Sequence, residues 1–133
     1  MFSVRNLTEE DYDILVEWWK QWRWTPPSRD FLPQNGTGGV MVNKDDVPIV
    51  AGFLYLTNSS VAWCEFIVSN FEYKNKDRKE AIKILINELT LIAENCGAKY
   101  VYTVVKNESL KKSYEEMGYV KGSTNVSKMV KFI

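Results

Sequence analysis

The fold is decided by residues 61–96, which read VAWCEFIVSNFEYKNKDRKEAIKILINELTLIAENC. The first nine of them are almost all apolar, which predicts a central strand covered on both faces. Residues 77–95 then place apolar side chains at helical spacing, with Asp77 as the expected N-cap and Gly97 as the expected left-handed residue after the helix. Residues 100–105 are rich in β-branched side chains and predict a second strand. A strand, a helix and a strand in this order predict a right-handed crossover between two parallel strands.

The residues before this unit predict a strand, a helix and a loop. Residues 2–6 are a strand candidate, and Thr8 is expected to cap a helix that continues until Pro26 and Pro27 stop it. Residues 25–39 are rich in proline and glycine, and they predict a loop with a short helical turn at 28–32.

Further strand candidates lie on both sides of the central unit. Residues 39–43 and 48–57 precede the strand at 61–69 and predict an antiparallel meander with it. After residue 105, Asn107 is expected to cap a short helix that Gly118 closes. Two last strand candidates follow, at 119–121 and 127–133. The expected order is therefore β, α, β, β, β, α, β, α, β, β.

Length and composition indicate one globular domain. The chain has 133 residues, of which 45% are hydrophobic and 26% charged, so we expect a single domain over residues 1–133. No signal peptide or membrane-spanning run is visible, which favours a cytoplasmic protein. The 17 basic and 17 acidic residues cancel, which makes a nucleic-acid partner unlikely. Lys121, Lys128 and Lys131 are the residues that such a partner would use.

The absence of histidine limits the chemistry. It excludes catalysis by Ser-His-Asp or Cys-His groups and the usual zinc sites. Cys64 and Cys96 lack the spacing of metal ligands, so we predict no metal. A general base must then be a carboxylate, tyrosine, lysine, thiolate or water.

The junction at residues 69–79 is predicted to bind phosphate. A loop that opens onto a helix N-terminus presents unpaired amides and the positive end of the helix dipole. Four basic side chains add charge there: Lys74, Lys76, Arg78 and Lys79. The alternative is a solvated loop with a charged first helical turn.

The second motif runs from Asn107 through Tyr114 to Gly118 and Tyr119. It is similar to the pattern Asn-x-x-Ala-x-x-x-Tyr-x-x-x-Gly-Phe/Tyr of the GNAT superfamily of N-acetyltransferases, with Leu110 at the alanine position. The order of predicted elements resembles that family over nearly the whole chain. The resemblance implies an α/β fold: a mixed, mostly antiparallel, twisted sheet with a central, splayed pair of parallel strands and helices on both faces.

The resemblance also implies a site for acetyl-CoA. In the family, a loop that reads roughly Arg/Gln-x-x-Gly-x-Gly/Ala holds the pyrophosphate, and here Asp77 and Lys79 replace both glycines. The residues expected to contact the cofactor are Val68, Ser69, Lys74, Asn75, Lys76, Asp77, Arg78, Lys79 and Asn107.

Two residues are candidates for catalysis by the same resemblance. Tyr114 is expected to protonate the departing thiolate, and the alternative is a half-buried structural tyrosine. Glu65, inside an apolar strand, is expected to act as the base, directly or through water, and the alternative is a carboxylate paired with a lysine or arginine.

Tryptophans near the end of the first predicted helix are candidates for selecting the acceptor. Trp22, Trp24 and Arg29 are expected to line the acceptor pocket, and the alternatives are core packing or a homodimer contact. The implied function is acetyl transfer from acetyl-CoA to an amine on a small molecule or peptide. The alternative is a degenerate GNAT-fold binding module that does not use acetyl-CoA.

Overall fold

The computed structural model describes residues 1–133. Its strands and helices are β1 (Phe2–Asn6), α1 (Asp11–Gln21), β2 (Gly39–Lys44), β3 (Val47–Leu56), β4 (Val61–Ser69), α2 (Arg78–Asn95), β5 (Tyr100–Tyr102) and α3 (Glu108–Glu116). Two short 3₁₀ turns, Arg29–Phe31 and Pro33–Gly36, lie between α1 and β2. No helix is long and apolar enough to span a membrane.

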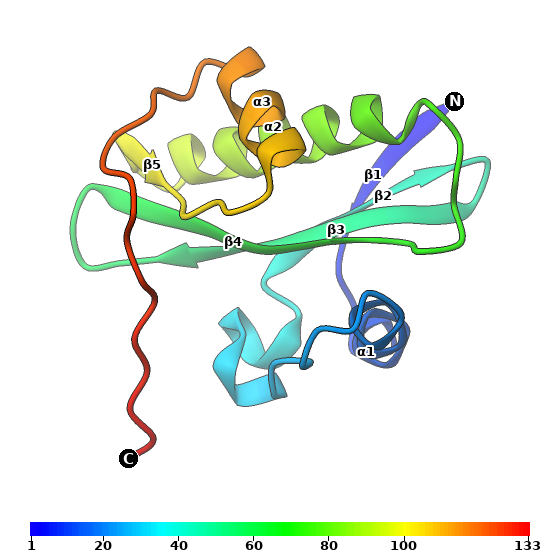
Figure 1. Cartoon of the computed structure of the whole chain (residues 1–133), viewed down its shortest axis with the longest axis horizontal. Coiled ribbons are helices and arrows are strands. Elements are labelled where there is room, and N and C mark those ends of the chain that lie inside the picture. The colour runs from blue at the N-terminus through cyan, green and yellow to red at the C-terminus, as the bar shows by residue number, and fades with distance from the viewer.

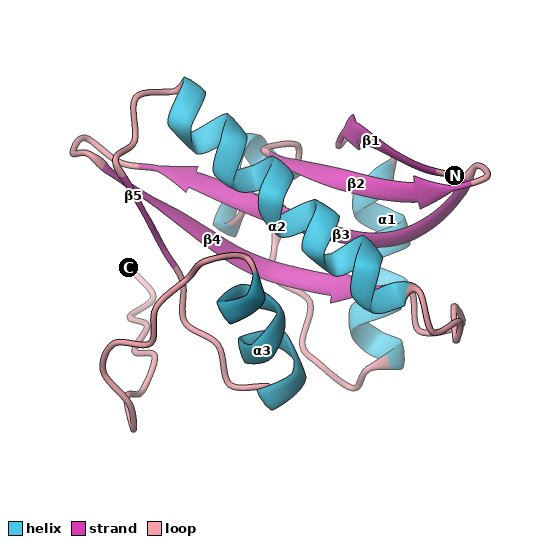
Figure 2. Ribbon diagram, turned by 90° about the horizontal axis from the view of Figure 1, so that it is seen from above, coloured by secondary structure: helices cyan, strands magenta, loops and turns pink.

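The five strands form one sheet in the order β1-β2-β3-β4-β5. The first four are antiparallel to their neighbours, and β4 pairs with β5 in parallel. Helices α2 and α3 lie on one face of the sheet, and α1 lies on the other with the 3₁₀ turns (Figure 1). Seen from above, α2 crosses the strands obliquely and α3 lies next to it (Figure 2). The expected mixed sheet with helices on both faces is confirmed.

Each face of the sheet has its own apolar core. Leu85 and Leu89 of α2 pack against Leu54 and other side chains of the sheet. On the opposite face, Trp19 of α1 stacks on Phe53 with the ring centroids 6.5 Å apart. Because side chains alternate along a strand, neighbouring residues of β3 serve the two different cores.

Much of the sequence prediction is confirmed to within one residue. The three strands of the meander and α2 have almost the predicted bounds. Gly97 and Gly118 adopt φ values of +93° and +94°, as expected for residues that follow helices. The Asn107 side chain caps α3 by accepting a hydrogen bond from the Leu110 amide at 2.9 Å.

The predicted ends of α1 were wrong. The helix begins at Asp11, and it is the Asp11 carboxylate that accepts hydrogen bonds from the Thr8 amide at 2.7 Å and hydroxyl at 3.1 Å. The helix stops at Gln21, well before the prolines, because Arg23 takes a left-handed φ of 63°. Thr8 therefore donates hydrogen bonds to Asp11, whereas the sequence predicted that the Thr8 side chain would accept one from a helix amide.

Replacing Asp11 with alanine should lower the free energy of unfolding by about 2 kcal/mol, because a buried carboxylate loses charge-assisted hydrogen bonds. Asp11 is 3% exposed, and Arg5 donates to its two oxygens at 2.7 and 2.9 Å. The Arg5 bonds, and then those of Thr8, hold the pKa of Asp11 below its usual value. The carboxylate therefore stabilises the fold above its unfolded pKa of about 3.9, and this contribution is lost as the pH falls through the lower folded pKa.

Urea denaturation at pH 7 and at about pH 3 measures this effect. The difference between wild type and Asp11→Ala should shrink in acid. Asp13→Ala, in the same turn but exposed, is the matched control. Equal stabilities of the two variants at pH 7 would contradict the prediction.

The predicted strands near the C-terminus were wrong or too long. β5 ends at Tyr102 rather than at residue 105, and residues 119–121 and 127–133 form no strand. The reason is the lack of a partner: no strand runs beside either segment, and most of their side chains are exposed. β-branched and aromatic composition favours a strand only where neighbouring backbone can pair with it.

Candidate functional site

The parallel strands β4 and β5 separate after three paired residues. The pairs are Val61–Tyr100, Ala62–Val101 and Trp63–Tyr102. One residue further along, the Thr103 hydroxyl donates to the Cys64 carbonyl at 2.7 Å. Beyond Cys64 this edge of β4 has no strand partner, so backbone groups there can bind an extended ligand, except the Ser69 carbonyl, which the Trp22 indole occupies. The expected splay of the parallel pair is confirmed.

A β-bulge lies in the open part of β4. Phe53 pairs with Glu65 and Ala51 pairs with Val68, so Phe66 and Ile67 together face one residue of β3. Phe66 has a positive φ of 56°, which is unusual for an aromatic residue. A bulge of this kind redirects side chains and interrupts pairing, and such bulges are common beside active sites.

The Asp77 side chain is directed away from the open edge. It accepts hydrogen bonds from Lys44 of β2 at 2.5 Å and from the Tyr73 hydroxyl at 2.7 Å, and it makes no capping bond to α2. The expected cap at Asp77 was therefore wrong. The bonds from Lys44 and then Tyr73 lower the pKa of Asp77. Since β2 lies on the opposite side of β4 from β5, the carboxylate points away from the splay.

The Arg78 side chain is used inside the protein. Its guanidinium donates to the Asn70 carbonyl at 3.1 Å and to the Tyr73 carbonyl, and it lies 5.6 Å from the centroid of the Trp22 ring. Burial lowers the pKa of Arg78, and its Nε atom is buried without a partner. These contacts of Arg78 hold the loop between β4 and α2 in place.

Other charges and amides of this junction are accessible. Lys74, Lys76 and Lys79 are exposed, as is Asn75, and the Lys74 ammonium lies 5.6 Å from the Phe71 ring centroid. The backbone amides of Lys79 and Glu80 in the first turn of α2 have no acceptor within the chain. Free amides and lysines are the groups that an anion would bind, and the role of these residues in binding phosphate stays a prediction.

Tyr114 lies in the core between α3 and β4. It is 3% exposed, and its hydroxyl donates to the Cys64 sulfur at 3.1 Å. Burial, and then the neighbouring Cys64, raise the pKa of Tyr114, and burial raises the pKa of Cys64 to about 12. Both groups are therefore neutral at physiological pH. The phenol already lies within hydrogen-bonding distance of a sulfur atom, next to the point where β4 and β5 separate.

Glu65 lies on the face of the sheet that α1 covers. Its side chain is 20% exposed and forms an ion pair with Lys128 at 3.3 Å. This face of β4 is only partly covered, since Trp63 is also partly exposed, so the prediction that both faces are covered holds only on the α2 side. Burial, and then the Glu65 charge, raise the pKa of the nearby Tyr55 to about 12.

The three predicted acceptor residues are not brought together. The Trp22 indole donates to the Ser69 carbonyl at 2.8 Å and stacks on Trp24, which is 50% exposed. Arg29 instead lies over the ring of Tyr12, 4.4 Å from its centroid, and donates to a carbonyl of the loop before α1. Trp22 thus anchors the end of β4. The role of all three in selecting an acceptor stays a prediction.

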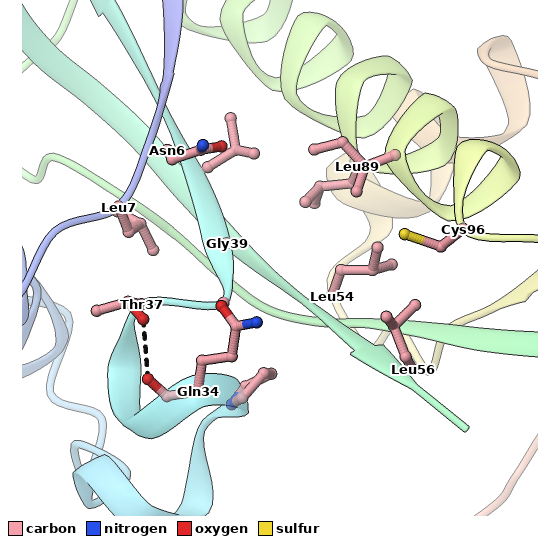
Figure 3. A pocket seen from close by; sticks show the side chains of 13 residues that line it. Asn6, Leu7, Gln34, Thr37, Gly39, Leu54, Leu56, Leu89 and Cys96 are labelled. Atoms are coloured by element: carbon pink, nitrogen blue, oxygen red, sulfur yellow. Dashed lines mark hydrogen bonds between the residues drawn. The ribbon is translucent and has the colours of Figure 1, made fainter. Parts of the chain in front are cut away.

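A separate cavity of about 580 Å³ lies at the other end of α2 (Figure 3). Leu54, Leu89 and Cys96 face it from β3 and α2, and Gln34 and Gly39 border it from the opposite side. It contains none of the predicted site residues. It is mostly apolar, and the Cys96 thiol is the single ionisable side chain among its lining residues.

Sequence reasoning missed several residues that shape the site. Thr103, Lys44 and Lys128 contact site residues that lie more than 30 positions away in the sequence. Nothing in the sequence marks these three residues except their type. A lysine or threonine in a polar segment is usually solvated, so residue type alone does not predict a contact. The bulge at Phe66 has no signal either, because positive φ usually marks glycine or asparagine.

Comparisons with known proteins support a single fold. No protein-family model and no curated sequence matches the chain. Solved structures do match. An acetyltransferase of Trypanosoma brucei has a TM-score of 0.68 at 17% identity, covering 98% of this chain and 100% of that one. Glucosamine-6-phosphate N-acetyltransferase of Arabidopsis thaliana has a TM-score of 0.67 at 16% identity, covering 98% and 99%.

A third match was solved with a ligand. AAC(6')-Iy, in complex with the bisubstrate analogue CoA-S-monomethyl-acetylneamine, has a TM-score of 0.70 at 15% identity, covering 99% of each chain. At sequence identities of 15–17%, these structural matches establish the fold and not the activity. Together with the splayed β4–β5 pair, they show that the chain has the fold of the GNAT acetyltransferases.

Proposed function

We propose that the protein transfers an acetyl group from acetyl-CoA to a primary amine. The observation that carries the proposal is the open edge of β4, which lies between a buried phenol on one face and a carboxylate on the other. Tyr114 and Glu65 extend from opposite faces of one strand. A ligand bound along that edge would meet a hydrogen-bond donor and a proton acceptor. A cytoplasmic location and a homodimer stay predictions.

The residues present fit acetyl-CoA, but three of the expected contact residues, Asp77, Arg78 and Asn107, have side chains that are bonded within the protein. The part of β4 beyond Cys64, where Val68 and Ser69 lie, would bind its extended arm through backbone groups that face away from β3, although the Ser69 carbonyl is already bonded to the Trp22 indole. Lys74, Lys76 and Lys79 would bind its phosphates beside the amides of α2. Asp77 does not oppose this, because its carboxylate is engaged by Lys44. Arg78 and Asn107 would act indirectly, since their side chains hold the loop and α3 in place. Bound acetyl-CoA supplies the acetyl group as a reactive thioester.

Glu65 would accept a proton from the acceptor ammonium. A primary ammonium must lose a proton before its nitrogen can attack a carbonyl carbon. The Glu65 carboxylate reaches solvent, so it can pass the proton on and take up the next.

Tyr114 would donate a hydrogen bond to the sulfur that leaves. Burial raises its pKa, whereas a thiol has a pKa of about 8.5, so complete proton transfer from the phenol to a thiolate is unfavourable. A neutral hydroxyl held in a dry site still stabilises a developing negative charge on sulfur. We therefore assign Tyr114 the role of hydrogen-bond donor in place of the full proton donor expected from the sequence.

Thermal unfolding with acetyl-CoA tests the proposal. Binding should stabilise the protein by about 2.7 kcal/mol at about one hundred times the dissociation constant. Desulfo-CoA and free pantetheine serve as controls that separate sulfur contacts from phosphate contacts. Lys74→Ala with Lys79→Ala should weaken the response to acetyl-CoA but not the response to pantetheine.

A second candidate function is binding without catalysis. The internal hydrogen bonds of Asp77 and Arg78 favour it. These bonds hold a loop without glycine in one conformation, and they engage both side chains within the protein. Under this alternative, acetyl-CoA produces no shift at millimolar concentration. Such a result would remove the acetyltransferase proposal.

A further inference from the structure

The last fifteen residues run from one face of the sheet to the other. They begin on the α2 side, where the Tyr119 hydroxyl shares a 2.6 Å hydrogen bond with Thr90 and its ring packs 4.8 Å from that of Tyr114. They end on the α1 side, after passing β5 and β4 (Figure 1). The segment thus passes from one face to the other beside β5, the edge strand of the sheet (Figure 1).

One contact holds the distal part of this segment. Val120, Met129 and Phe132 are 92%, 88% and 91% exposed, and no backbone hydrogen bond involves any residue after Tyr119. The ion pair between the Lys128 ammonium and the Glu65 carboxylate is the single polar contact that joins residues 120–133 to the rest of the chain. The apolar residues around Lys128 do not pack, so packing does not explain why this lysine lies at Glu65.

The surroundings of Glu65 suit an alkylammonium group. Trp63 and Tyr55 are cross-strand partners and lie on the same face of the sheet as Glu65, two residues along β4 from Glu65 and two along β3 from its partner Phe53. Tyr102 of β5 packs on Trp63 with centroids 4.4 Å apart and is 53% exposed. A carboxylate beside accessible aromatic rings attracts an ammonium by charge and by the negative faces of the rings. Neutral or anionic acceptors gain nothing from this combination.

We propose that Glu65 and these rings form the acceptor subsite for lysine side chains presented by an extended peptide, and that the chain's own Lys128 occupies it and is acetylated there. The proposal rests on the proposed function and names its acceptor class. Lys128 is a primary alkyl amine on an unstructured segment, already next to the carboxylate assigned as the base. An exposed ion pair of this kind is weak, so the segment can leave and a lysine of another peptide can enter.

The reaction balances without a further reactant. The Lys128 ammonium gives one proton to Glu65, which releases it to solvent. The Lys128 nitrogen then forms a bond to the acetyl carbon of the thioester, the carbon–sulfur bond breaks, and the second nitrogen proton neutralises the departing thiolate. The products are N-acetyllysine at position 128, free coenzyme A and one proton in solution. The acetylated side chain loses its charge and therefore its ion pair with Glu65.

Mass spectrometry of the full chain incubated with acetyl-CoA tests the acetylation. Lys128 should be acetylated at least tenfold faster than Lys131, which lies on the same exposed segment and serves as an internal control. The first-order rate constant should not change with protein concentration, because the group is transferred within one chain. Glu65→Gln should remove the preference for Lys128. Equal rates at the two lysines in the wild type, or a rate constant that rises with protein concentration, would overturn the proposal.

A measurement without acetyl-CoA separates the subsite from the activity. Acetic anhydride labels free amines, and an amine held in contact with the Glu65 carboxylate is less accessible to the reagent than one without such a contact. In the protein alone, Lys128 should label several-fold more slowly than Lys131, and Glu65→Gln should bring the two rates together. Equal labelling in the wild type would overturn the subsite.

The two experiments together distinguish the possible failures. A thermal shift with acetyl-CoA, combined with neither protection nor acetylation of Lys128, overturns this inference and leaves the proposed function intact. Protection of Lys128 with no thermal shift overturns acetyl transfer, and with it the acetylation, but supports an ammonium subsite at Glu65. Lys128→Arg should keep the thermal shift in every case, because the side chain lies outside the surface assigned to acetyl-CoA.

Discussion

Replacing Tyr114 with phenylalanine should lower kcat for acetyl transfer by about 100- to 1,000-fold while the protein stays folded. The substitution removes one hydroxyl group, whose bond to the Cys64 sulfur contributes about 1 kcal/mol to stability. The aromatic ring, which fills the space between α3 and β4, is retained. The large effect on kcat follows because the lost hydrogen bond would act on charge that forms only as the thioester breaks.

Tyr119→Phe is the matched control for this prediction. Tyr119 packs against Tyr114 and loses a comparable hydrogen bond, to Thr90, on substitution. The two variants should unfold at similar urea concentrations, but only Tyr114→Phe should lose activity. Equal kcat values for the two would make Tyr114 a structural residue.

The pH profile gives a second readout. Because burial raises the pKa of Tyr114, the phenol stays protonated throughout an ordinary assay range. Wild type and Tyr114→Phe should therefore show kcat profiles of the same shape and different height. A basic limb present in the wild type and absent in the variant would contradict the hydrogen-bonding role.

Replacing Phe53 with alanine should lower the free energy of unfolding by about 3–5 kcal/mol. In the sheet, Phe53 of β3 pairs with Glu65 of β4. The ring is fully buried and stacks on Trp19 of α1. Its loss leaves a cavity that neighbouring elements of the sheet cannot fill, because they are held by backbone pairing. A domain of this size is stabilised by about 5–15 kcal/mol in total, so the variant should be close to unfolding at 37 °C.

Urea denaturation followed by tryptophan fluorescence measures the change. Leu56→Ala, on the same strand but at a side chain that is 58% exposed, is the matched control and should cost less than about 1.5 kcal/mol. Similar losses for the two variants would mean that the core beneath α1 is not closely packed.

Local sequence patterns predicted the parts of the fold whose partners lie nearby. The helix spacing in residues 78–95, the Asn107 cap and the left-handed Gly97 all depend on contacts within a few residues. The meander was also predictable, because its strands are consecutive and joined by short turns. For the site, the pattern of Asn107, Tyr114 and Gly118 identified Tyr114, whose buried hydroxyl donates to the sulfur of the chain's own Cys64; its catalytic role stays a prediction.

Competition between partners defeated several local predictions. Asp77 has the right type and position for a helix cap, yet Lys44 and Tyr73 form stronger, charge-assisted bonds with it. Residues 127–133 have strand composition, yet no neighbouring strand is available to pair with them. In both cases the residue type was read correctly, and a group distant in the sequence decided the outcome.

Periodicity and caps act over one or two turns of chain, and they were enough to predict an α/β domain with an apolar strand at 61–69, a covering helix and a tyrosine motif; the predicted central position of that strand was wrong, because β4 is the fourth of five strands. Three features became visible only in the folded chain: the point where β4 and β5 separate, the bulge at Phe66, and the contact between Lys128 and Glu65. Those features depend on backbone pairing and charge contacts between residues dozens of positions apart. No local propensity encodes them, because each arises only when the folded chain brings both partners together.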